Sequence, residues 1–271
     1  MIEQTIGFIG AGQMARALAG GFVGNGLVQP SQLVATDPSQ SARDQFSEQI
    51  RGCRFVLDNT ALIEAADLVV LAVKPQLVDT VIAQVDGCCS PDKLLVSIGA
   101  GVTLSRLCTG FGTDRVIRVM PNTPCLVGCG ASAYALGAGA SREDGELVGR
   151  LLGAVGIAYA VDESLLDAVT GLSGSGPAFV YTVIESLSDG GVRMGLPRAI
   201  ATQLAAQTVL GAAQMVLASG EHPAVLRDRV TSPGGTTIAG IQALENQGLR
   251  SALMGGVEAA TRRSVELAND K

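Results

Sequence analysis

The sequence predicts an α/β region followed by an all-helical region, on three observations. A GxGxxA sequence, Gly10 to Ala15, lies between a strand-like run and an apolar pattern of helical spacing. Short, continuous apolar runs, typical of buried parallel strands, recur as far as Val161. From Asp162 onward these runs stop and helical spacing takes over. We therefore expect an α/β N-terminal Rossmann-type dinucleotide-binding domain over residues 1–162, followed by an all-α domain for substrate binding and dimerisation over residues 163–271.

The composition fits a chain of two domains that binds small molecules. Its 271 residues are 47% hydrophobic, enough for sizeable cores, and the surplus of apolar side chains suggests a subunit interface. The formal net charge of −6 argues against a nucleic-acid surface, which needs clustered Lys and Arg. No run of 18 residues is free of charged and strongly polar side chains, so we expect no membrane partner.

The start of the chain and its cysteines indicate a reducing compartment. No basic segment followed by a cleavable apolar region opens the sequence, so we expect a cytoplasmic protein. The cysteines form no CxxC pair and have no histidine nearby, so we expect neither a metal site nor a disulfide framework. We expect small buried hydrophobic residues instead. The six are Cys53, Cys88, Cys89, Cys108, Cys125 and Cys129.

The glycine-rich turn is the first candidate for a cofactor site. A strand-like run from Thr5 to Ile9 leads straight into it, and helical spacing follows through Phe22. Gly10 permits the sharp turn, Gly12 lets the backbone approach a pyrophosphate, and the small Ala15 lets helix and strand pack closely. This context makes the motif far more specific than the glycines alone.

The second predicted strand, Gln32 to Thr36, ends at an acidic residue, Asp37. An acidic side chain at this place normally holds the ribose hydroxyls of NAD and repels the 2′-phosphate of NADP. Hydroxyl and guanidinium groups nearby favour the opposite choice, because they can hold that phosphate. They are Thr36, Ser39, Ser41 and Arg43. The sequence therefore leaves NAD and NADP open.

Further strand-like runs place polar or small residues at their carboxyl ends, where ligands of open parallel sheets bind. Lys74-Pro75 follows the run Leu68 to Val73, and Asp58-Asn59-Thr60 caps a helix after Phe55 to Leu57. The runs Leu94 to Ile98 and Val116 to Met120 end at Gly99-Ala100-Gly101 and Pro121-Asn122-Thr123-Pro124. Edge strands over Ala131 to Ala135 and Ile157 to Val161 are expected around a helix from Glu143 to Leu152.

The helical half contains long helices rich in small side chains. We expect one to begin at Pro177 and another at Pro197, with a shorter one from His222-Pro223 to Val230. Two more are expected over Thr236 to Asn246 and Leu249 to Leu267. Many alanines in these helices allow close approach and suit a subunit interface. We expect His222, the only histidine, to begin its helix rather than transfer protons.

Between two of these helices lies a polar turn, Ser232-Pro233-Gly234-Gly235-Thr236-Thr237. Its backbone N–H groups can point at one small anion where a helix begins. The alternative is an ordinary helix start with Thr236 or Thr237 as the N-cap.

Five segments in this order resemble one family. They are Phe8 to Met14, Val73-Lys74-Pro75, Met120 to Pro124, Gly174-Ser175-Gly176-Pro177-Ala178 and Ser232 to Thr237. Over essentially its whole length the chain resembles pyrroline-5-carboxylate reductase, and Leu226 to Glu245 is similar to that family's most specific signature. The resemblance implies hydride transfer from NAD(P)H to the C=N carbon of 1-pyrroline-5-carboxylate, giving L-proline in the last step of proline biosynthesis.

The resemblance also implies roles for individual residues. The pyrophosphate would be held by Gly10, Gly12, Gln13 and Met14. The ribose or its phosphate would contact Thr36, Asp37 and Ser39, and the adenosine part would contact Asn59. The nicotinamide half would lie beside Val73, Lys74, Pro75, Ala100 and Asn122. Ser232, Gly234, Gly235, Thr236 and Thr237 would bind the substrate, with backbone N–H groups on its carboxylate and the Thr237 hydroxyl, the candidate catalytic group, facing the ring nitrogen. Subunits would pair through the C-terminal helices, with larger rings of dimers also implied.

Two other functions are weighed against this one. A hydroxyacid dehydrogenase of similar plan needs a lysine in the helical half to move the hydroxyl proton, and here that half has only its last residue, Lys271. A dinucleotide-sensing regulator without turnover would need no second polar turn. A cyclic iminium already carries positive charge, so its reduction requires orientation more than a strong acid.

Overall fold

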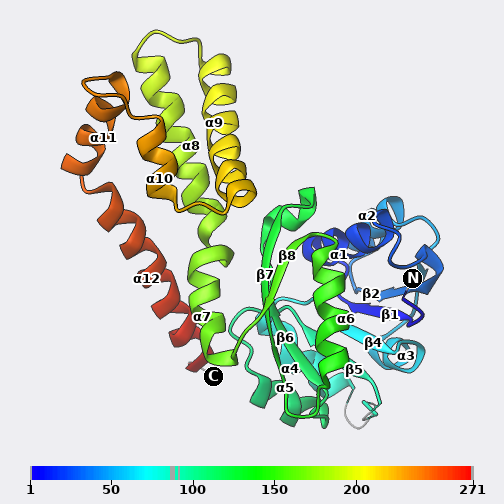
Figure 1. Cartoon of the computed structure of the whole chain (residues 1–271). Coiled ribbons are helices and arrows are strands. Elements are labelled where there is room, and N and C mark those ends of the chain that lie inside the picture. The colour runs from blue at the N-terminus through cyan, green and yellow to red at the C-terminus, as the bar shows by residue number, and fades with distance from the viewer. Residues whose placement is uncertain (1, 86–88, 91, 270–271) are drawn as a thin grey trace. The chain divides into compact units, whose positions relative to one another are not determined.

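The chain forms two compact units (Figure 1). A computed structural model describes residues 2–85, 89–90 and 92–269. By contacts, the first unit runs to Ser175 and resumes at Ala259, and the second is Gly176–Glu258. Residues 163–175 and the end of the last helix therefore pack with the N-terminal region in this division. The domain boundary expected after residue 162 stays a prediction.

The first unit is built on one eight-stranded sheet in the order β3-β2-β1-β4-β5-β6-β7-β8. Its pairs are parallel except β6 with β7, which is antiparallel. Every residue of the central strands β1, β2, β4 and β5 is buried, as their continuous apolar sequences predict. The strands are β1 (Ile6–Ile9), β2 (Leu33–Thr36), β3 (Arg54–Phe55), β4 (Leu68–Leu71), β5 (Leu94–Ser97), β6 (Val116–Met120), β7 (Gly130–Leu136) and β8 (Gly156–Ala160).

Helices cover this sheet and bury its two apolar faces. Side-chain N-caps that accept a backbone N–H begin several of them, including Ser39, Asp58, Thr103 and Ser141. The helices are α1 (Gln13–Gly24), α2 (Gln40–Gln49), α3 (Asn59–Ala65), α4 (Val78–Gln84), α5 (Leu104–Phe111), α6 (Arg142–Gly153) and α7 (Leu166–Val169), with short helices η1 (Pro30–Gln32), η2 (Pro75–Leu77), η3 (Thr123–Val127), η4 (Glu163–Leu165) and η5 (Thr170–Gly174).

The strand order places a crevice beside β1. Strand β1 pairs with β2 on one side and with β4 on the other, so the chain direction across the sheet reverses there. Ligands of such sheets bind outside the carboxyl ends of the strands at this switch point. The turns after β1 and β4 are therefore the expected position of a ligand site.

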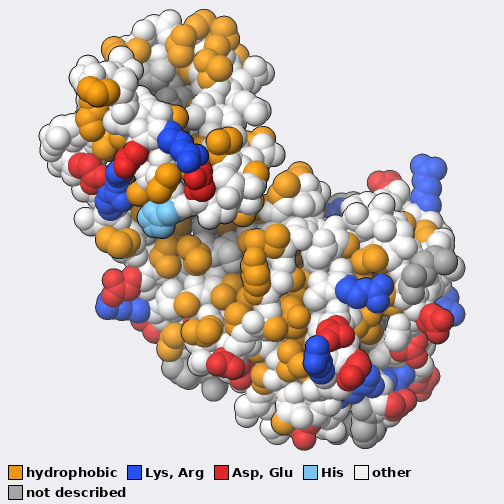
Figure 2. Space-filling view, viewed as in Figure 1, with side chains coloured by type: hydrophobic (Ala, Val, Ile, Leu, Met, Phe, Trp, Pro, Cys, Tyr) orange, Lys and Arg blue, Asp and Glu red, His pale blue; other side chains and the backbone are white. Residues whose placement is uncertain are grey.

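The second unit is helical and contains α8 (Gly176–Arg193), α9 (Arg198–Ser219), α10 (Pro223–Arg229) and α11 (Thr236–Asn246), with the start of α12 (Leu249–Asn269). Only Ser188, Ala201 and Ala205 are buried in it, and none of these is a large apolar residue. Apolar side chains are spread over its surface instead (Figure 2). Within one subunit this unit lacks a hydrophobic core.

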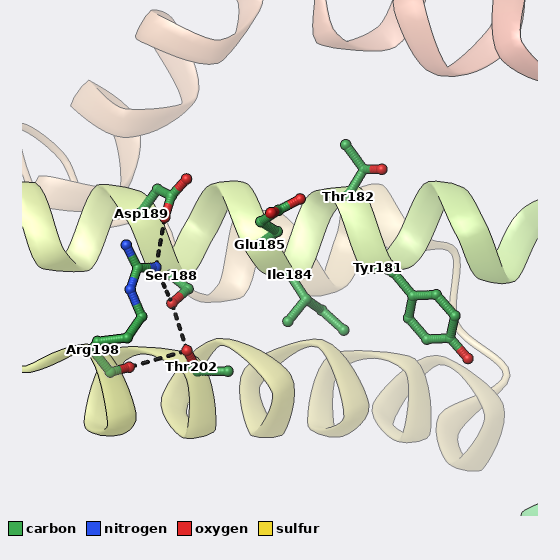
Figure 3. Close-up of a pocket in the computed structure, with 8 residues that line it drawn as sticks. All are labelled: Tyr181, Thr182, Ile184, Glu185, Ser188, Asp189, Arg198 and Thr202. Carbon is green, nitrogen blue, oxygen red and sulfur yellow. Dashed lines mark hydrogen bonds and ion pairs between the residues drawn. The ribbon is translucent and has the colours of Figure 1, made fainter.

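A polar cluster joins α8 to α9 (Figure 3). Ser188 shares a hydrogen bond with Thr202, 2.8 Å between their hydroxyl oxygens, and accepts another from Arg198. Arg198 also lies 2.5 Å from Asp189. Beside these groups runs an open groove of about 660 Å³, into which Tyr181 and Ile184 also project. These contacts fix the two helices against each other at one end.

Among the described residues, α9 alone is long and apolar enough to cross a membrane by length and composition. Only 11% of its apolar stretch is buried within the subunit. Its Gln and Thr side chains interrupt the apolar run, and the expectation of no membrane partner stays a prediction.

The predicted fold class is confirmed: a Rossmann-type sheet is followed by helices. The cysteines agree less well with expectation. Cys125 is buried, but Cys53, Cys89 and Cys108 are half-buried and Cys129 is exposed, so the expectation of burial is wrong for Cys129. Burial raises the pKa of the Cys53, Cys108 and Cys125 thiols. Cys88 lies outside the described residues.

Candidate active site

The glycine-rich turn after β1 has the geometry that phosphate binding requires. Gly10 has φ +99°, and a Cβ there would lie 2.8 Å from the Ala72 carbonyl oxygen, so only glycine fits. Gly12 is the N-cap of α1, and no side chain caps that helix. A Cβ on Gly12 would point into open space. The first backbone N–H groups of α1, from Gln13 and Met14, are therefore available to an anion that approaches Gly12.

Asp37 braces this turn at the end of β2. Its Oδ2 accepts the Ala11 N–H at 2.8 Å, and its Oδ1 accepts the Ser39 N–H at 2.8 Å. Both carboxylate oxygens thus already accept a backbone hydrogen bond. Arg43 donates to the Asp37 carbonyl and to Gln40 Oε1, which holds its guanidinium close to the same strand end. The acidic and the basic candidate for ribose recognition therefore lie side by side.

A cavity of about 470 Å³ lies beside them and brings predicted residues together. Thr36, Asp37 and Asn59 line it, and so does Arg43. Asn59 donates to Gln84 Oε1 at 2.6 Å, which orients its amide. Ser39 does not line the cavity. Its Oγ accepts the Ala42 N–H at the start of α2.

A second cavity, of about 340 Å³, lies at the ends of β4 and β5. Pro75 and Ala100 line it, as the sequence predicts for neighbours of one ligand. Val73 and Lys74 are not among its lining residues, and Lys74 is exposed at the start of η2. Gln76 and Gly101, the chain neighbours of Pro75 and Ala100, line it too. The rest of the wall was not predicted. It consists of Thr170 and Ser175 from the chain around η5 and of Ala260, Arg263, Ser264 and Leu267 from α12.

One signal in the sequence points to that unpredicted wall. Ala260, Arg263, Ser264 and Leu267 follow the i, i+3, i+4, i+7 spacing of a single helix face. This spacing shows that the four side chains share a face. It does not show that the face packs on the first unit, because that contact joins segments far apart in the sequence, such as Ser264 and Asp167, which are 97 residues apart.

Asn122 is buried after β6, and its amide is used by the protein itself. Its Nδ2 donates to the Ser173 carbonyl at 3.0 Å, and its Oδ1 accepts the Ala131 N–H at 2.9 Å. The side chain therefore ties η5 and β7 to the end of β6. It does not line the 340 Å³ cavity.

The polar turn, Ser232 to Thr237, lies in the helical unit and is described by itself. Gly234 has φ +66°, and a Cβ on Gly235 would collide with Ser232 Oγ. Gly235 is the N-cap of α11, and no side chain caps the helix. The alternative expectation of Thr236 or Thr237 as the cap is wrong, because both lie inside the first helical turn. Their N–H groups are among those that an α-helix leaves without an internal partner.

His222 begins α10, as predicted. Its Nδ1 accepts the Ala224 N–H at 3.2 Å in the N-cap position. Over the part of the chain that the structure describes, no group of three or more His, Cys, Asp or Glu side chains could hold a metal ion. Lys271, the only lysine expected in the helical half, lies outside the described residues.

The turn after β1 thus fits the pyrophosphate of a dinucleotide, because it offers an uncapped helix start and open space at Gly12. In the strand order of the sheet the two cavities flank β1, one at the ends of β2 and β3 and the other at the ends of β4 and β5. The Ser232–Thr237 turn offers a second uncapped helix start in the other unit. Chemically, the chain can hold a dinucleotide and, separately, a small anion.

Two protein-family models match successive parts of the chain. Residues 163–267 match the family described as pyrroline-5-carboxylate reductase dimerisation. Residues 5–101 match the family described as NADP oxidoreductase, coenzyme F420-dependent.

Individual relatives match over nearly the whole chain. A pyrroline-5-carboxylate reductase of Glycine max is 49% identical over 97% of this chain and 96% of its own length. The human pyrroline-5-carboxylate reductase 2 is 42% identical over 97% of this chain and 83% of its own.

Solved structures agree. The pyrroline-5-carboxylate reductase of Coxiella burnetii superposes with a TM-score of 0.92 at 35% identity, covering 98% of this chain and 99% of that one. The Plasmodium falciparum pyrroline carboxylate reductase with NADP bound gives 0.88 at 34% identity, covering 99% of both chains. With such identity along nearly its full length, and with the fold and both uncapped helix starts in place, the chain belongs to the pyrroline-5-carboxylate reductase family.

Proposed function

We infer that the chain is an NAD(P)H-dependent oxidoreductase that reduces 1-pyrroline-5-carboxylate to L-proline, the final step of proline biosynthesis. The observation that carries this inference is the identity of 42–49% to curated enzymes of that name along 97% of the chain. The geometry of the glycine-rich turn agrees with it. A hydroxyacid dehydrogenase and a non-catalytic sensor of the dinucleotide are not favoured by any relative named above.

We propose that the dinucleotide lies across the switch point of the sheet. Gly10, Gly12, Gln13 and Met14 would hold the pyrophosphate, supported by the uncapped start of α1. Thr36, Asp37 and Asn59 would meet the adenosine half, supported by the 470 Å³ cavity that they share, with Ser39 nearby. Pro75 and Ala100 would flank the nicotinamide half in the 340 Å³ cavity, with Val73 and Lys74 just before them.

We propose that Asn122 acts on the nicotinamide half indirectly, without touching it. Because its amide bonds both to Ser173 and to Ala131, it would shape the nicotinamide side by holding η5 in place. Its remaining amide hydrogen is its one unused donor.

The Ser232–Thr237 turn is the proposed carboxylate site. Substrate binding there is supported by the positive φ of Gly234, by the lack of space for a side chain on Gly235, and by the uncapped α11 start. N–H groups of Gly235, Thr236 and Thr237 would hold the carboxylate. The Thr237 hydroxyl, in the first turn of the helix, would orient the ring nitrogen.

The bound dinucleotide supplies the hydride for the C=N carbon. The protein's task is to orient an iminium that already carries positive charge, so the absence of a strong acid among these residues is no obstacle. The Thr237 hydroxyl oxygen would accept a hydrogen bond from the iminium N–H. The N–H groups of the turn would fix the carboxylate, and with it the face of the ring.

The chain self-associates through its helical half, which is the dimerisation domain of the family. The physical reason is the missing core: the unit Gly176–Glu258 buries no large apolar side chain by itself. We propose that rings of dimers form in addition, that the partner subunit completes the substrate site, and that the enzyme works in the cytoplasm.

The test is turnover by the purified protein. We expect oxidation of NADPH or NADH, followed at 340 nm, only when pyrroline-5-carboxylate is present, and equal amounts of proline formed. Running both cofactors at saturating substrate ranks them, which decides between the Asp37 and Arg43 interpretations. No oxidation with either cofactor would refute the function.

A further inference from the structure

The last turns of α12 return to the first unit and form one wall of the cavity at the ends of β4 and β5. Ala260, Ser264 and Leu267 lie on the same helix face and line that cavity together with Pro75 and Ala100. Leu267 also lies next to Gly101, which directly follows Ala100. A helix from the far end of the chain therefore covers the loop between β5 and α5.

Ser264, at the centre of that face, is 5% exposed and makes a specific bond. Its Oγ donates to Asp167 Oδ1 at 2.7 Å, joining α12 to α7 across 97 residues of sequence. A buried hydrogen bond from a hydroxyl group fixes both the rotation of a helix about its axis and its position along that axis. The apolar contacts of Ala260 and Leu267 alone would tolerate sliding.

The acceptor of this bond belongs to a charge network around the buried Arg118. Arg118 is 4% exposed and lies 3.7 Å from Asp167 Oδ1 and 3.1 Å from Glu163 Oε1. Glu163 Oε1 also accepts the Leu104 N–H at 2.7 Å. Leu104 is the first residue of α5, so the network anchors the far end of the loop that carries Ala100. A buried guanidinium such as that of Arg118 holds its carboxylate partners in place, because losing one of them would leave it without a counter-charge.

The loop from Gly99 to Thr103 is thus held twice. Glu163 fixes its end at Leu104, and α12 covers its middle at Gly101. The two contacts are connected, because Arg118 pairs both with Glu163 and with Asp167, to which α12 is bonded through Ser264. A shift of α12 would move one wall of the cavity and uncover the loop at the same time.

We propose that Ser264 is a positioning residue for the nicotinamide half of the cofactor. It acts through Asp167, by holding α12 against the loop that bears Ala100. The proposal rests on the proposed function in one respect, the assignment of the 340 Å³ cavity to the nicotinamide side.

The test compares two ligands that differ only in the nicotinamide part. Binding of NADPH and of 2′-phospho-ADP-ribose is measured by calorimetry on the full chain and on Ser264→Ala. Loss of the hydrogen bond should weaken NADPH binding about three- to tenfold, the range of one hydrogen bond. Binding of 2′-phospho-ADP-ribose should stay within twofold, because the 470 Å³ cavity has no residue of α12 in its lining. Ser251→Ala is the matched control, an exposed serine of the same helix.

Three results would overturn the proposal: equal weakening of both ligands by Ser264→Ala, no weakening of either, or the same loss in Ser251→Ala. The first would show general damage rather than positioning. The proposed function can fail separately. If Ser264→Ala weakens binding of NADPH but not of 2′-phospho-ADP-ribose, and the wild-type protein does not turn over pyrroline-5-carboxylate, the proposed function is refuted and the positioning role stands.

Discussion

Thr237 is the residue on which the proposed chemistry depends most. It is the second residue of α11, half-buried, and follows a turn that no side chain caps. We expect Thr237→Ala to lower kcat about 10- to 100-fold, the usual effect of losing one oriented polar group at a reacting centre. The dissociation constant of NADPH should stay within twofold, because every proposed cofactor contact belongs to the other unit. Steady-state kinetics and NADPH titration check both values.

The matched control for this variant is Thr80→Ala. Thr80 is exposed and lies, like Thr237, in the first turn of a helix, here α4. Its loss should leave kcat within twofold. If Thr237→Ala weakened NADPH binding as much as it lowers kcat, the Ser232–Thr237 turn would be a structural element rather than a substrate site.

The place of Asp37 in the fold could be predicted from the sequence, but its hydrogen bonds could not. Its place at the end of the second strand was predictable, and so was its nearness to the glycine-rich turn. The sequence did not show that both its oxygens accept backbone N–H groups, from Ala11 and Ser39. That pairing depends on how two loops approach each other. The side chain therefore has a structural role beside any contact with ribose.

At the scale of elements, α6 offers a test of how the sheet is held at the end opposite the glycine-rich turn. Asp144 accepts two hydrogen bonds from Arg115, at 2.9 and 2.7 Å, and one from the Ser141 N–H in a capping box. The Arg115 hydrogen bonds and the Ser141 N–H together lower the pKa of Asp144, against the opposing effect of burial. We expect Asp144→Asn to reduce the free energy of unfolding by about 2 kcal/mol at pH 7.

The loss of unfolding free energy in Asp144→Asn should become smaller as the pH falls. A carboxylate whose pKa is lowered by folding stabilises the folded state above its ordinary pKa of about 4. That contribution disappears as the pH falls through the lowered value. The gap between wild type and Asp144→Asn should therefore be full at pH 7 and narrow below about pH 4, as urea unfolding at fixed protein concentration would show.

The control is Glu146→Gln on the same helix. Glu146 is 62% exposed and pairs with Arg142 at 2.9 Å, so its loss should change the unfolding free energy by less than about 0.5 kcal/mol. A gap for Asp144→Asn that stayed constant from pH 7 to pH 3 would contradict the assigned cause.

Most elements were predictable because their signals are local. The continuous apolar runs gave the central strands, and α11 begins and ends where expected, at Thr236 and Asn246. Several features depend on distant contacts and were not predicted. The antiparallel β7 beside β6, the π-helical turn η5 and the return of α12 to the first unit are of this kind. The same division applies to the site: the glycine-rich turn was visible, whereas Thr170, Ser175 and Ser264 required the fold.

At the scale of the whole molecule, the two units differ in how they are stabilised. The first has an extensive apolar core on both faces of its sheet. The second buries only Ser188, Ala201 and Ala205 and exposes large apolar side chains on every helix. A chain of this kind reaches its stable form through pairing, which agrees with the dimerisation family that its helical half matches.

The reaction depends on the transfer of hydride from the dinucleotide to the C=N carbon of the pyrroline ring. The most direct measurement uses NADPH, or NADH if that is the better cofactor, deuterated on the transferred face of nicotinamide C4. Mass and NMR spectra of the proline formed should show one deuterium per molecule, at ring carbon C5. Proline without deuterium, or oxidation of the cofactor without proline, would contradict the account.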